Sequence, residues 1–352
     1  MTKVFIVGGG TGGHVLPAIA LADELVAEGL DPAEVLFIGA ARGMEREAVP
    51  NAGYRIELLP GRGITRNVSL ENVKSILGIL RATARAFQIV RAERPRVIGG
   101  FGGYASVPGM IAGTLLRVPR IVHEQNAEPG WANRLAVRLG ARPTVGFPVA
   151  RWPDATIVGN PVRSAFMNAE HREEAPLEVL IVGGSLGART LNNIGIALAD
   201  VFAQRSDAKL TIVAGARDID RVEAALANTT ADVTALSFVD DLAERYARSA
   251  VVVARAGAIT VSELACVGVP SVLIPLPGAP GDHQTANARW LADADGAECI
   301  AENEGAIERT VSHVLALLEN PRRRQAMADA AKSLSNPGAA AALAEIVRSS
   351  GV

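Results

Sequence analysis

Residues 4–14 read VFIVGGGTGGH, and this stretch decides the fold. The apolar run 4–7 is followed by six residues of which five are glycine, and then by apolar residues at helical spacing at Val15, Ile19, Ala22 and Val26. Glycines let backbone amides approach a ligand closely, and a helix N-terminus favours an anion. This order of strand, glycine loop and helix predicts the opening unit of a parallel α/β sheet with an anion-binding turn.

The same alternation continues along the chain. Further strands are predicted near residues 35–38, 96–98 and 120–123, and helices near 70–93, 107–117 and 131–139. After the proline-containing segment 147–163 the alternation starts again, with strands at 178–182, 210–213, 233–237, 251–254 and 271–274. We therefore predict an α/β fold of two Rossmann-like domains, residues 1–162 and 163–352, with a C-terminal helix over 338–350 that can pack back on the N-terminal domain.

Composition excludes several classes of protein. Aromatic residues make up 4% of the 352, and the net charge is −2, so neither base stacking nor a basic field for nucleic acid is expected. No apolar run reaches the ~18–20 residues of a membrane span. The two cysteines, Cys266 and Cys299, lie far apart, which argues against a disulfide framework or a metal centre and favours the reducing cytoplasm.

Charge is unevenly distributed between the two predicted domains. Residues 1–162 carry a net charge of +5 and residues 163–352 carry −7. Segment 73–94 combines apolar residues with Lys74, Arg81, Arg85, Arg91 and Arg94. This pattern by itself favours an ordinary domain helix with a solvated basic face, and the alternative is a helix that docks on an anionic membrane surface.

The first glycine loop also matches the G-x-G-x-x-G dinucleotide fingerprint. That fingerprint expects an acidic residue at the end of the second strand to bind a ribose diol. Here the strand continues Gly39-Ala40-Ala41-Arg42, with no acid. An NADP-dependent oxidoreductase that uses Arg42 stays open as an alternative.

Two more glycine clusters follow predicted strands. Residues 99–104 read GGFGGY, and residues 183–189 read GGSLGAR, with Ser185 offering a hydroxyl where a phosphate would lie. One anion loop in each half predicts ligands on both walls of a deep interdomain cleft.

Polar residues at predicted strand ends are further candidates. His14 follows the first loop and could act as a general base or simply cap the helix. Residues 123–126 read HEQN, a polar run that favours binding over burial in the core. Thr260 and Glu263 fit an S/T-x-x-E capping box, although Glu263 could instead bind a ribose diol. Residues 282–287 could contact a sugar or cap a late helix.

Six motifs, taken together, resemble the MurG family of peptidoglycan glycosyltransferases. They are GGGTGGH at 8–14, GGFGGY at 99–104, HEQN at 123–126, GNPVR at 159–163, GGSLGAR at 183–189 and RAGAITVSEL at 255–264. The resemblance covers nearly the whole chain in family order. It implies the GT-B arrangement, with UDP-N-acetylglucosamine bound by the C-terminal half and the acceptor pyrophosphate by the N-terminal loops.

The resemblance also implies roles for single residues. It places the diphosphate near Ser185 and Arg163, the ribose on Glu263, uracil at the backbone of Val239, and the sugar near Asn126, Gln284 and the turn of Thr11, Gly12 and Gly13. His14 is the family's candidate base, and Gly102, Gly103 and Tyr104 belong to the acceptor loop. The nucleotide and phosphates are expected along the turn formed by Ala258, Ile259, Thr260, Val261, Ser262 and Glu263.

The implied activity is inverting transfer of N-acetylglucosamine to the C4 hydroxyl of a lipid-linked muramyl-pentapeptide, giving lipid II in peptidoglycan synthesis. Such an enzyme is expected at the cytoplasmic face of the bacterial plasma membrane as a peripheral protein. The need to reach a lipid-linked acceptor, together with the +5 charge of residues 1–162, favours docking through segment 73–94. No Asp-x-Asp lies between a strand and the nucleotide loop, so a leaving-group site without metal or other cofactor is expected. A UDP-N-acetylglucosamine 2-epimerase-like enzyme and a non-catalytic sugar-nucleotide binding module are further alternatives.

Overall fold

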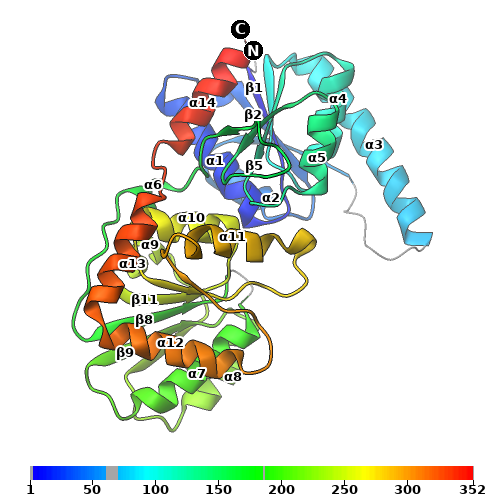
Figure 1. Cartoon of the computed structure of the whole chain (residues 1–352). Coiled ribbons are helices and arrows are strands. Elements are labelled where there is room, and N and C mark those ends of the chain that lie inside the picture. The colour runs from blue at the N-terminus through cyan, green and yellow to red at the C-terminus, as the bar shows by residue number, and fades with distance from the viewer. Residues whose placement is uncertain (1–2, 61–69, 185–186, 352) are drawn as a thin grey trace. The chain divides into compact units, whose positions relative to one another are not determined.

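A computed structural model describes residues 3–60, 70–184 and 187–351, with side chains omitted for residues 70–77. The chain divides into two compact units (Figure 1). The first unit contains Met1–Arg163 and Asn336–Val352, and the second contains Ser164–Ser335. The last segment of the chain therefore belongs to the first unit.

The first unit is built on a seven-stranded parallel sheet of order β3-β2-β1-β4-β5-β6-β7. Its strands are β1 (Val4–Val7), β2 (Val35–Ala40), β3 (Arg55–Leu59), β4 (Val97–Gly100), β5 (Arg120–Glu124), β6 (Arg142–Val145) and β7 (Thr156–Ile157). Its helices are α1 (Gly12–Ala27), η1 (Pro32–Glu34), α2 (Glu45–Asn51), α3 (Leu70–Glu93), α4 (Ser106–Leu115), α5 (Trp131–Arg138) and α14 (Ala339–Ser350).

The second unit repeats the plan with a six-stranded parallel sheet of order β10-β9-β8-β11-β12-β13. Its strands are β8 (Leu177–Val182), β9 (Ala208–Val213), β10 (Val233–Leu236), β11 (Ser249–Ala254), β12 (Ser271–Leu273) and β13 (Glu298–Cys299). Its helices are α6 (Ser164–Met167), α7 (Arg189–Phe202), α8 (Ile219–Leu226), α9 (Leu242–Arg248), α10 (Ala258–Val267), η2 (Pro280–Asp282), α11 (His283–Ala292), α12 (Ala306–Glu319) and α13 (Pro321–Ser333). The α/β prediction with two Rossmann-like domains is confirmed.

The central strands are mostly apolar because helices cover both faces of each sheet, although β8 contains the buried Glu178 and β11 begins with the buried Ser249. Every residue of β1 and β11 is buried. In the first unit, one apolar cluster joins the sheet to α1, and a second joins it to α3, α4 and α5. These cores leave only the strand ends for binding.

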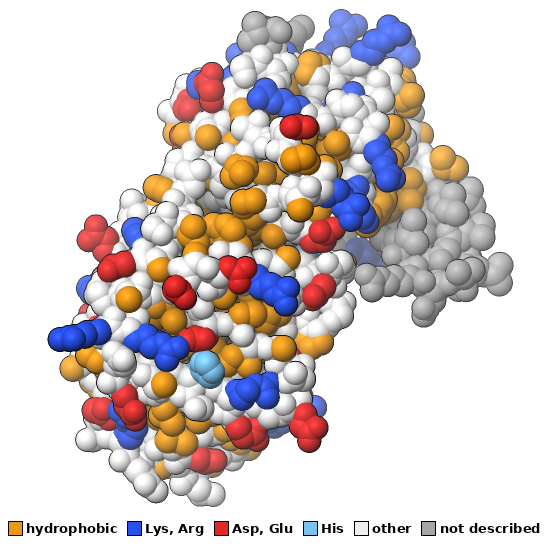
Figure 2. All heavy atoms as spheres, in the orientation of Figure 1, with side chains coloured by type: hydrophobic (Ala, Val, Ile, Leu, Met, Phe, Trp, Pro, Cys, Tyr) orange, Lys and Arg blue, Asp and Glu red, His pale blue; other side chains and the backbone are white. Residues whose placement is uncertain are grey.

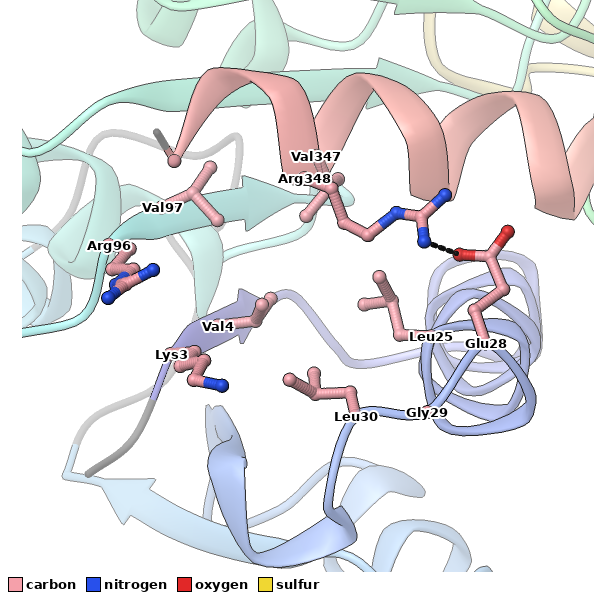
Figure 3. Close-up of a pocket in the computed structure, with 11 residues that line it drawn as sticks. Lys3, Val4, Leu25, Glu28, Gly29, Leu30, Arg96, Val97, Val347 and Arg348 are labelled. Carbon is pink, nitrogen blue, oxygen red and sulfur yellow. Dashed lines mark ion pairs between the residues drawn. The ribbon is translucent and has the colours of Figure 1, made fainter.

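Helix α14 completes one face of the first unit. Leu343, Ala344 and Val347 lie in the same apolar cluster as Leu21 and Leu25 of α1, and Figure 1 shows α14 beside α1. Figure 3 shows the end of this contact, where Arg348 pairs with Glu28 at 3.1 Å beside a cavity of about 310 Å³ at the amino ends of β1 and β4.

Burial predicts that α14 is necessary for the stability of the first unit. Leu343 is 1% exposed, so Leu343→Ala should lower the free energy of unfolding by about 2–5 kcal/mol, as expected for a core leucine truncated to alanine. Urea unfolding followed by circular dichroism measures the loss. Glu345→Ala, on the exposed side of the same helix, is the matched control and should change stability by less than about 0.5 kcal/mol. Equal losses in the two variants would contradict a packing role for α14.

Candidate active site

Both sheets have a topological switch point between two central strands. In the first unit the switch lies between β1 and β4, and in the second between β8 and β11. Ligands of open α/β sheets bind at the carboxyl ends of such strands, because the connections there lead away in opposite directions. The glycine-containing segments 8–13, 99–104, 183–189 and 255–257 follow these four strands.

The two glycine loops of the first unit pack directly against each other. The Phe101 amide donates to the Val7 carbonyl at 2.8 Å. Gly103 has a φ of +76°, and a Cβ there would lie 2.2 Å from the Gly9 carbonyl oxygen. No other residue fits this backbone approach without displacing the first loop. The two loops therefore form one surface at the switch point.

Thr11 and His14 lie together on this surface. Thr11 is the N-cap of α1 without a side-chain capping bond, and its Oγ1 lies 3.2 Å from His14 Nδ1. A Cβ on Gly102 would lie 3.2 Å from His14 Cδ2, so the imidazole packs on the second loop. The structure thus brings Thr11, Gly12, Gly13, His14, Gly102 and Gly103 to one place.

Tyr104, the last residue of the second loop, has a buried hydroxyl. Its oxygen is shielded from solvent and has no hydrogen-bond partner in the described part of the chain. Burial raises the pKa of Tyr104, so the group stays protonated and keeps a donor at neutral pH.

The HEQN run is mostly core, which contradicts the interpretation that all four side chains serve binding. His123, Glu124 and Gln125 are each 1% exposed. The Glu124 carboxylate accepts from the Asn126 amide at 3.0 Å, the Gly130 amide at 2.9 Å and Asn133 Nδ2 at 2.8 Å. A polar run can be buried when its groups satisfy one another, and sequence alone did not reveal these partners. Asn126 is only half-buried at the edge of this network.

His123 and Glu124 are therefore poorly suited to act as bases. His123 lies between Thr144 Oγ1 and Asn160 Oδ1, both at 3.2 Å. Burial lowers the pKa of His123 to about 4, partly offset by the Asn160 hydrogen bond, so the ring is neutral at physiological pH. The His123 and Glu124 side chains hold the end of β5 in place. His14 is more exposed than either of them and remains the base candidate that the sequence predicts.

In the second unit, helix α7 begins with unprotected amides. Gly187 has a φ of +73°, and a Cβ there would lie 2.2 Å from the Ala214 carbonyl oxygen. The N-cap is Ala188, which has no side-chain capping bond among the described residues, so these residues leave the first amides of α7 open to an anion. Ser185, predicted beside the diphosphate, lies outside the described residues.

Helix α10 also has an uncapped N-terminus, at the neighbouring strand β11. Its N-cap is Gly257, and the first helical bond runs from the Val261 amide to the Gly257 carbonyl at 2.9 Å. The capping-box interpretation is therefore wrong, because Thr260 lies inside the helix and Glu263 one turn further on. Glu263 is a carboxylate only 4% exposed.

The rest of this turn is divided between core and surface. Ala258, Ile259 and Val261 have buried side chains, so only their backbone can meet a ligand. Ser262 donates its hydroxyl to the Ala258 carbonyl at 2.9 Å. The turn therefore offers backbone amides as its main anion-binding groups.

Glu302, which sequence reasoning missed, connects the two helix N-termini. Thr190 in the first turn of α7 donates to Glu302 Oε1 at 2.6 Å, and Arg255, directly after β11, pairs with Oε2. Burial opposes ionisation of Glu302, but these hydrogen bonds outweigh it and lower the pKa. Glu302 follows β13, the edge strand, and no local motif marks it.

Three further residues that the sequence predicts to bind the donor are Val239, Gln284 and Arg163. Val239 follows β10 and is half-buried. Gln284, in the first turn of α11, accepts from the Leu276 amide at 2.9 Å through Oε1, which leaves its NH₂ group directed elsewhere. Arg163 is exposed and is the last residue of the first unit before the division.

The described residues contain neither a metal-binding cluster nor a membrane-spanning helix. Within ranges 3–60, 70–184 and 187–351, no group of three or more His, Cys, Asp or Glu side chains could hold a metal ion. Over the same part of the chain, no helix is long and apolar enough to cross a membrane.

Comparison with known proteins identifies this combination of units. Residues 4–142 match the glycosyltransferase family 28 N-terminal domain, and residues 178–343 match its C-terminal domain. Together with the two Rossmann-like units, these matches define a glycosyltransferase of the GT-B class.

Relatives narrow the assignment. Proteins of Alkalilimnicola ehrlichii (38% identical, covering 97% of both chains) and Anaeromyxobacter dehalogenans (39% identical, covering 98% of this chain and 92% of that one) carry one name. Both are UDP-N-acetylglucosamine–N-acetylmuramyl-(pentapeptide) pyrophosphoryl-undecaprenol N-acetylglucosamine transferases. The crystal structure of Acinetobacter baumannii MurG superposes with a TM-score of 0.81 at 29% identity, covering 99% of this chain and all of that one. The chain belongs to the MurG family, and the predicted resemblance is confirmed.

The Glu302 contacts predict a role in donor binding without contact to the donor. Glu302→Gln should weaken UDP affinity about tenfold, because Thr190 and Arg255 bond to different carboxylate oxygens, the amide keeps an acceptor at only one of these positions, and the two helix N-termini lose their common anchor. Isothermal titration with UDP measures the change. Glu304→Gln, exposed two residues further on, is the control and should bind UDP as the parent does. Unchanged affinity in Glu302→Gln would contradict the anchor.

Proposed function

We propose that this protein transfers N-acetylglucosamine from UDP-N-acetylglucosamine to the C4 hydroxyl of a lipid-linked muramyl-pentapeptide, forming lipid II with inversion at the anomeric carbon. The observation that carries the proposal is the pair of uncapped helix N-termini, α7 and α10, at the switch point of the second unit. Family membership supports the substrate pair, since the relatives are named for this transfer. The oxidoreductase and epimerase alternatives lack that support.

The donor binds to the second unit in this proposal. Amides at the start of α7 and α10, with Ser185 and Arg163, meet the diphosphate and stabilise the charge that develops as UDP leaves. Glu263 accepts hydrogen bonds from the ribose diol, and the backbone at Val239 meets uracil. Gln284 donates its NH₂ group to the sugar, since Oε1 is already held by Leu276, and Asn126 contributes from the first unit.

The acceptor binds to the loops of the first unit, with its pyrophosphate against residues 8–13 and the loop of Gly102, Gly103 and Tyr104. His14 acts as general base. When its Nδ1 carries the proton and donates to Thr11 Oγ1, Nε2 is the basic nitrogen. Thr11 Oγ1 can accept this bond, so its position is compatible with the tautomer that the reaction needs.

The reaction is a direct displacement. The acceptor C4 oxygen bonds to the anomeric carbon as the bond from that carbon to the UDP oxygen breaks. The hydroxyl proton moves to His14 Nε2, and the negative charge moves to the diphosphate. All of the groups invoked are protein groups, and the proposal uses no cofactor.

We place the enzyme at the cytoplasmic face of the plasma membrane, because an undecaprenol-linked acceptor stays in the bilayer. The part of α3 whose side chains are described, residues 78–93, supports docking through Leu80, which is 60% exposed, and the neighbouring exposed Arg81. Arg85 is less available, since it pairs with Glu57 at 3.3 Å. Ile89 and Val90 pack in the core, so the apolar docking residues must come from the other face. Ile76, Leu77 and Lys74 have side chains outside the described set.

The charges on the face drawn in Figure 2 favour attraction to lipid through one segment over attraction by a whole surface. On the face drawn in Figure 2, acidic and basic side chains are interspersed. This face therefore has no broad basic field, and the proposal places docking on the short basic and apolar segment in the described part of α3.

His14→Ala tests the chemical step. With UDP-N-acetylglucosamine and a lipid-linked muramyl-pentapeptide, the parent protein should form the disaccharide product, and the variant should lose about 10²–10⁴-fold in kcat because no base accepts the hydroxyl proton. UDP affinity should stay unchanged, since the proposal places no contact between His14 and the nucleotide. Chromatography of radiolabelled product measures the rate.

Two results would count against this assignment. No transfer by the parent protein would reject the proposed function. A loss below about tenfold in His14→Ala would make His14 a positioning residue rather than the base.

Vesicle binding tests the membrane proposal. Sedimentation with vesicles rich in phosphatidylglycerol should be strong at low salt and weak at high salt. Arg81→Glu should reduce vesicle affinity about tenfold, because each basic side chain near an anionic surface contributes about 1 kcal/mol and the reversal also adds repulsion. The matched control is Arg322→Glu, an equal charge change on an exposed arginine of the second unit. Equal effects of the two reversals, or equal binding to neutral vesicles, would refute docking through α3.

A further inference from the structure

Glu45 is a buried carboxylate in the first unit that the proposed mechanism does not use. It is the first residue of α2 and is 1% exposed. Its Oε2 accepts from the Gly10 amide at 2.8 Å, and its Oε1 accepts from the Ala40 amide at 2.8 Å. One side chain thus joins the glycine loop after β1 to the last residue of β2.

Three glycines make room for this carboxylate. A Cβ would lie 2.1 Å from Glu45 Oε1 at Gly9, 2.5 Å from Glu45 Cγ at Gly39 and 1.9 Å from Glu45 Oε2 at Gly43. Any side chain at these positions would displace the carboxylate. The segments around β1 and β2 therefore form a cradle that fits one carboxylate supplied by the chain itself.

The position of the cradle has a chemical meaning. A dinucleotide-binding Rossmann unit holds its nucleotide at two points. The glycine-loop amides bind the phosphate, and an acid at the end of the second strand binds the ribose. Here the amides of Gly10 and Ala40, one at each point, are already bonded to Glu45. A nucleotide would have to displace a buried, doubly hydrogen-bonded carboxylate, which is costly.

We propose that Glu45 is a positioning and specificity-determining residue whose carboxylate acts as a built-in ligand of the first unit. It holds the first glycine loop in the shape needed for the acceptor and closes the path that a nucleotide would take. The loop connects this effect to the reaction. Gly10 directly precedes Thr11, and the Gly9 carbonyl supports Gly103 of the second loop. This inference rests on the proposed function for its catalytic consequence, but not for the hydrogen bonds themselves.

Three variants test the proposal. Glu45→Ala removes both acceptors and leaves space for an acetate ion. Glu45→Gln keeps the volume and one acceptor oxygen, and it decides the outcome if Glu45→Ala does not fold. Glu47→Ala, exposed on the same helix, is the matched control.

Glu45→Ala should lower kcat/KM for the lipid acceptor about 10²-fold, since small displacements of a positioned group cost about that much. Sodium acetate should raise the kcat/KM of Glu45→Ala at least tenfold, whereas sodium chloride at equal ionic strength should not. Glu45→Gln should show a smaller loss and no rescue. UDP affinity should match the parent in all three variants.

Hydrogen exchange provides a readout that needs no acceptor. In a peptide spanning residues 8–14, followed by mass spectrometry, exchange should be at least tenfold faster in Glu45→Gln than in the parent or in Glu47→Ala, because the Gly10 amide loses a charge-assisted bond. This measurement separates the two proposals. Faster exchange with no transfer by the parent protein would reject the proposed function alone.

Two results would overturn the role of Glu45. One is parent-like kcat/KM in Glu45→Ala, or in Glu45→Gln where the alanine variant does not fold. The other is a loss of activity without faster exchange at residues 8–14 and without rescue by acetate.

Discussion

The free amides at the carboxyl ends of the central strands determine where this protein can bind anions. A parallel sheet whose strand order reverses leaves two neighbouring loops uncovered by crossover helices. In the second unit both loops lead into helices whose N-caps, Ala188 and Gly257, offer no side chain to their first amides. Water or an anion must satisfy such groups, and in the proposed function the diphosphate of the donor does so.

The two units differ in what bonds to the amides at the carboxyl ends of their central strands. In the first unit the Glu45 carboxylate already occupies the Gly10 amide, whereas in the second unit Glu302 bonds to side chains beside the helix N-termini and leaves their amides open. Two units with the same strand order can therefore have different ligands. This difference also explains why a glycine fingerprint in the first unit does not imply a dinucleotide enzyme.

Much of the fold could be predicted from sequence, because apolar runs of four to six residues and helical spacing are local signals. The interpretation of residues 4–14 and of the four loops at the switch points depended on such signals. Contacts between distant residues could not be predicted in this way. Glu45 and Glu302 bond to groups 35 and 112 residues away, and the burial of His123 depends on Asn160, 37 residues later. The capping-box interpretation failed because the helix begins at Ala258, two residues before Thr260.

A crystal structure of the protein with UDP-N-acetylglucosamine tests the central claim most directly. The account predicts one nucleotide per chain, with its diphosphate on the first-turn amides of α7 and α10 and its ribose hydroxyls on Glu263. The first unit should hold no nucleotide, and Glu45 should keep its bonds to Gly10 and Ala40. A nucleotide phosphate on residues 8–13, with Glu45 displaced, would contradict the account.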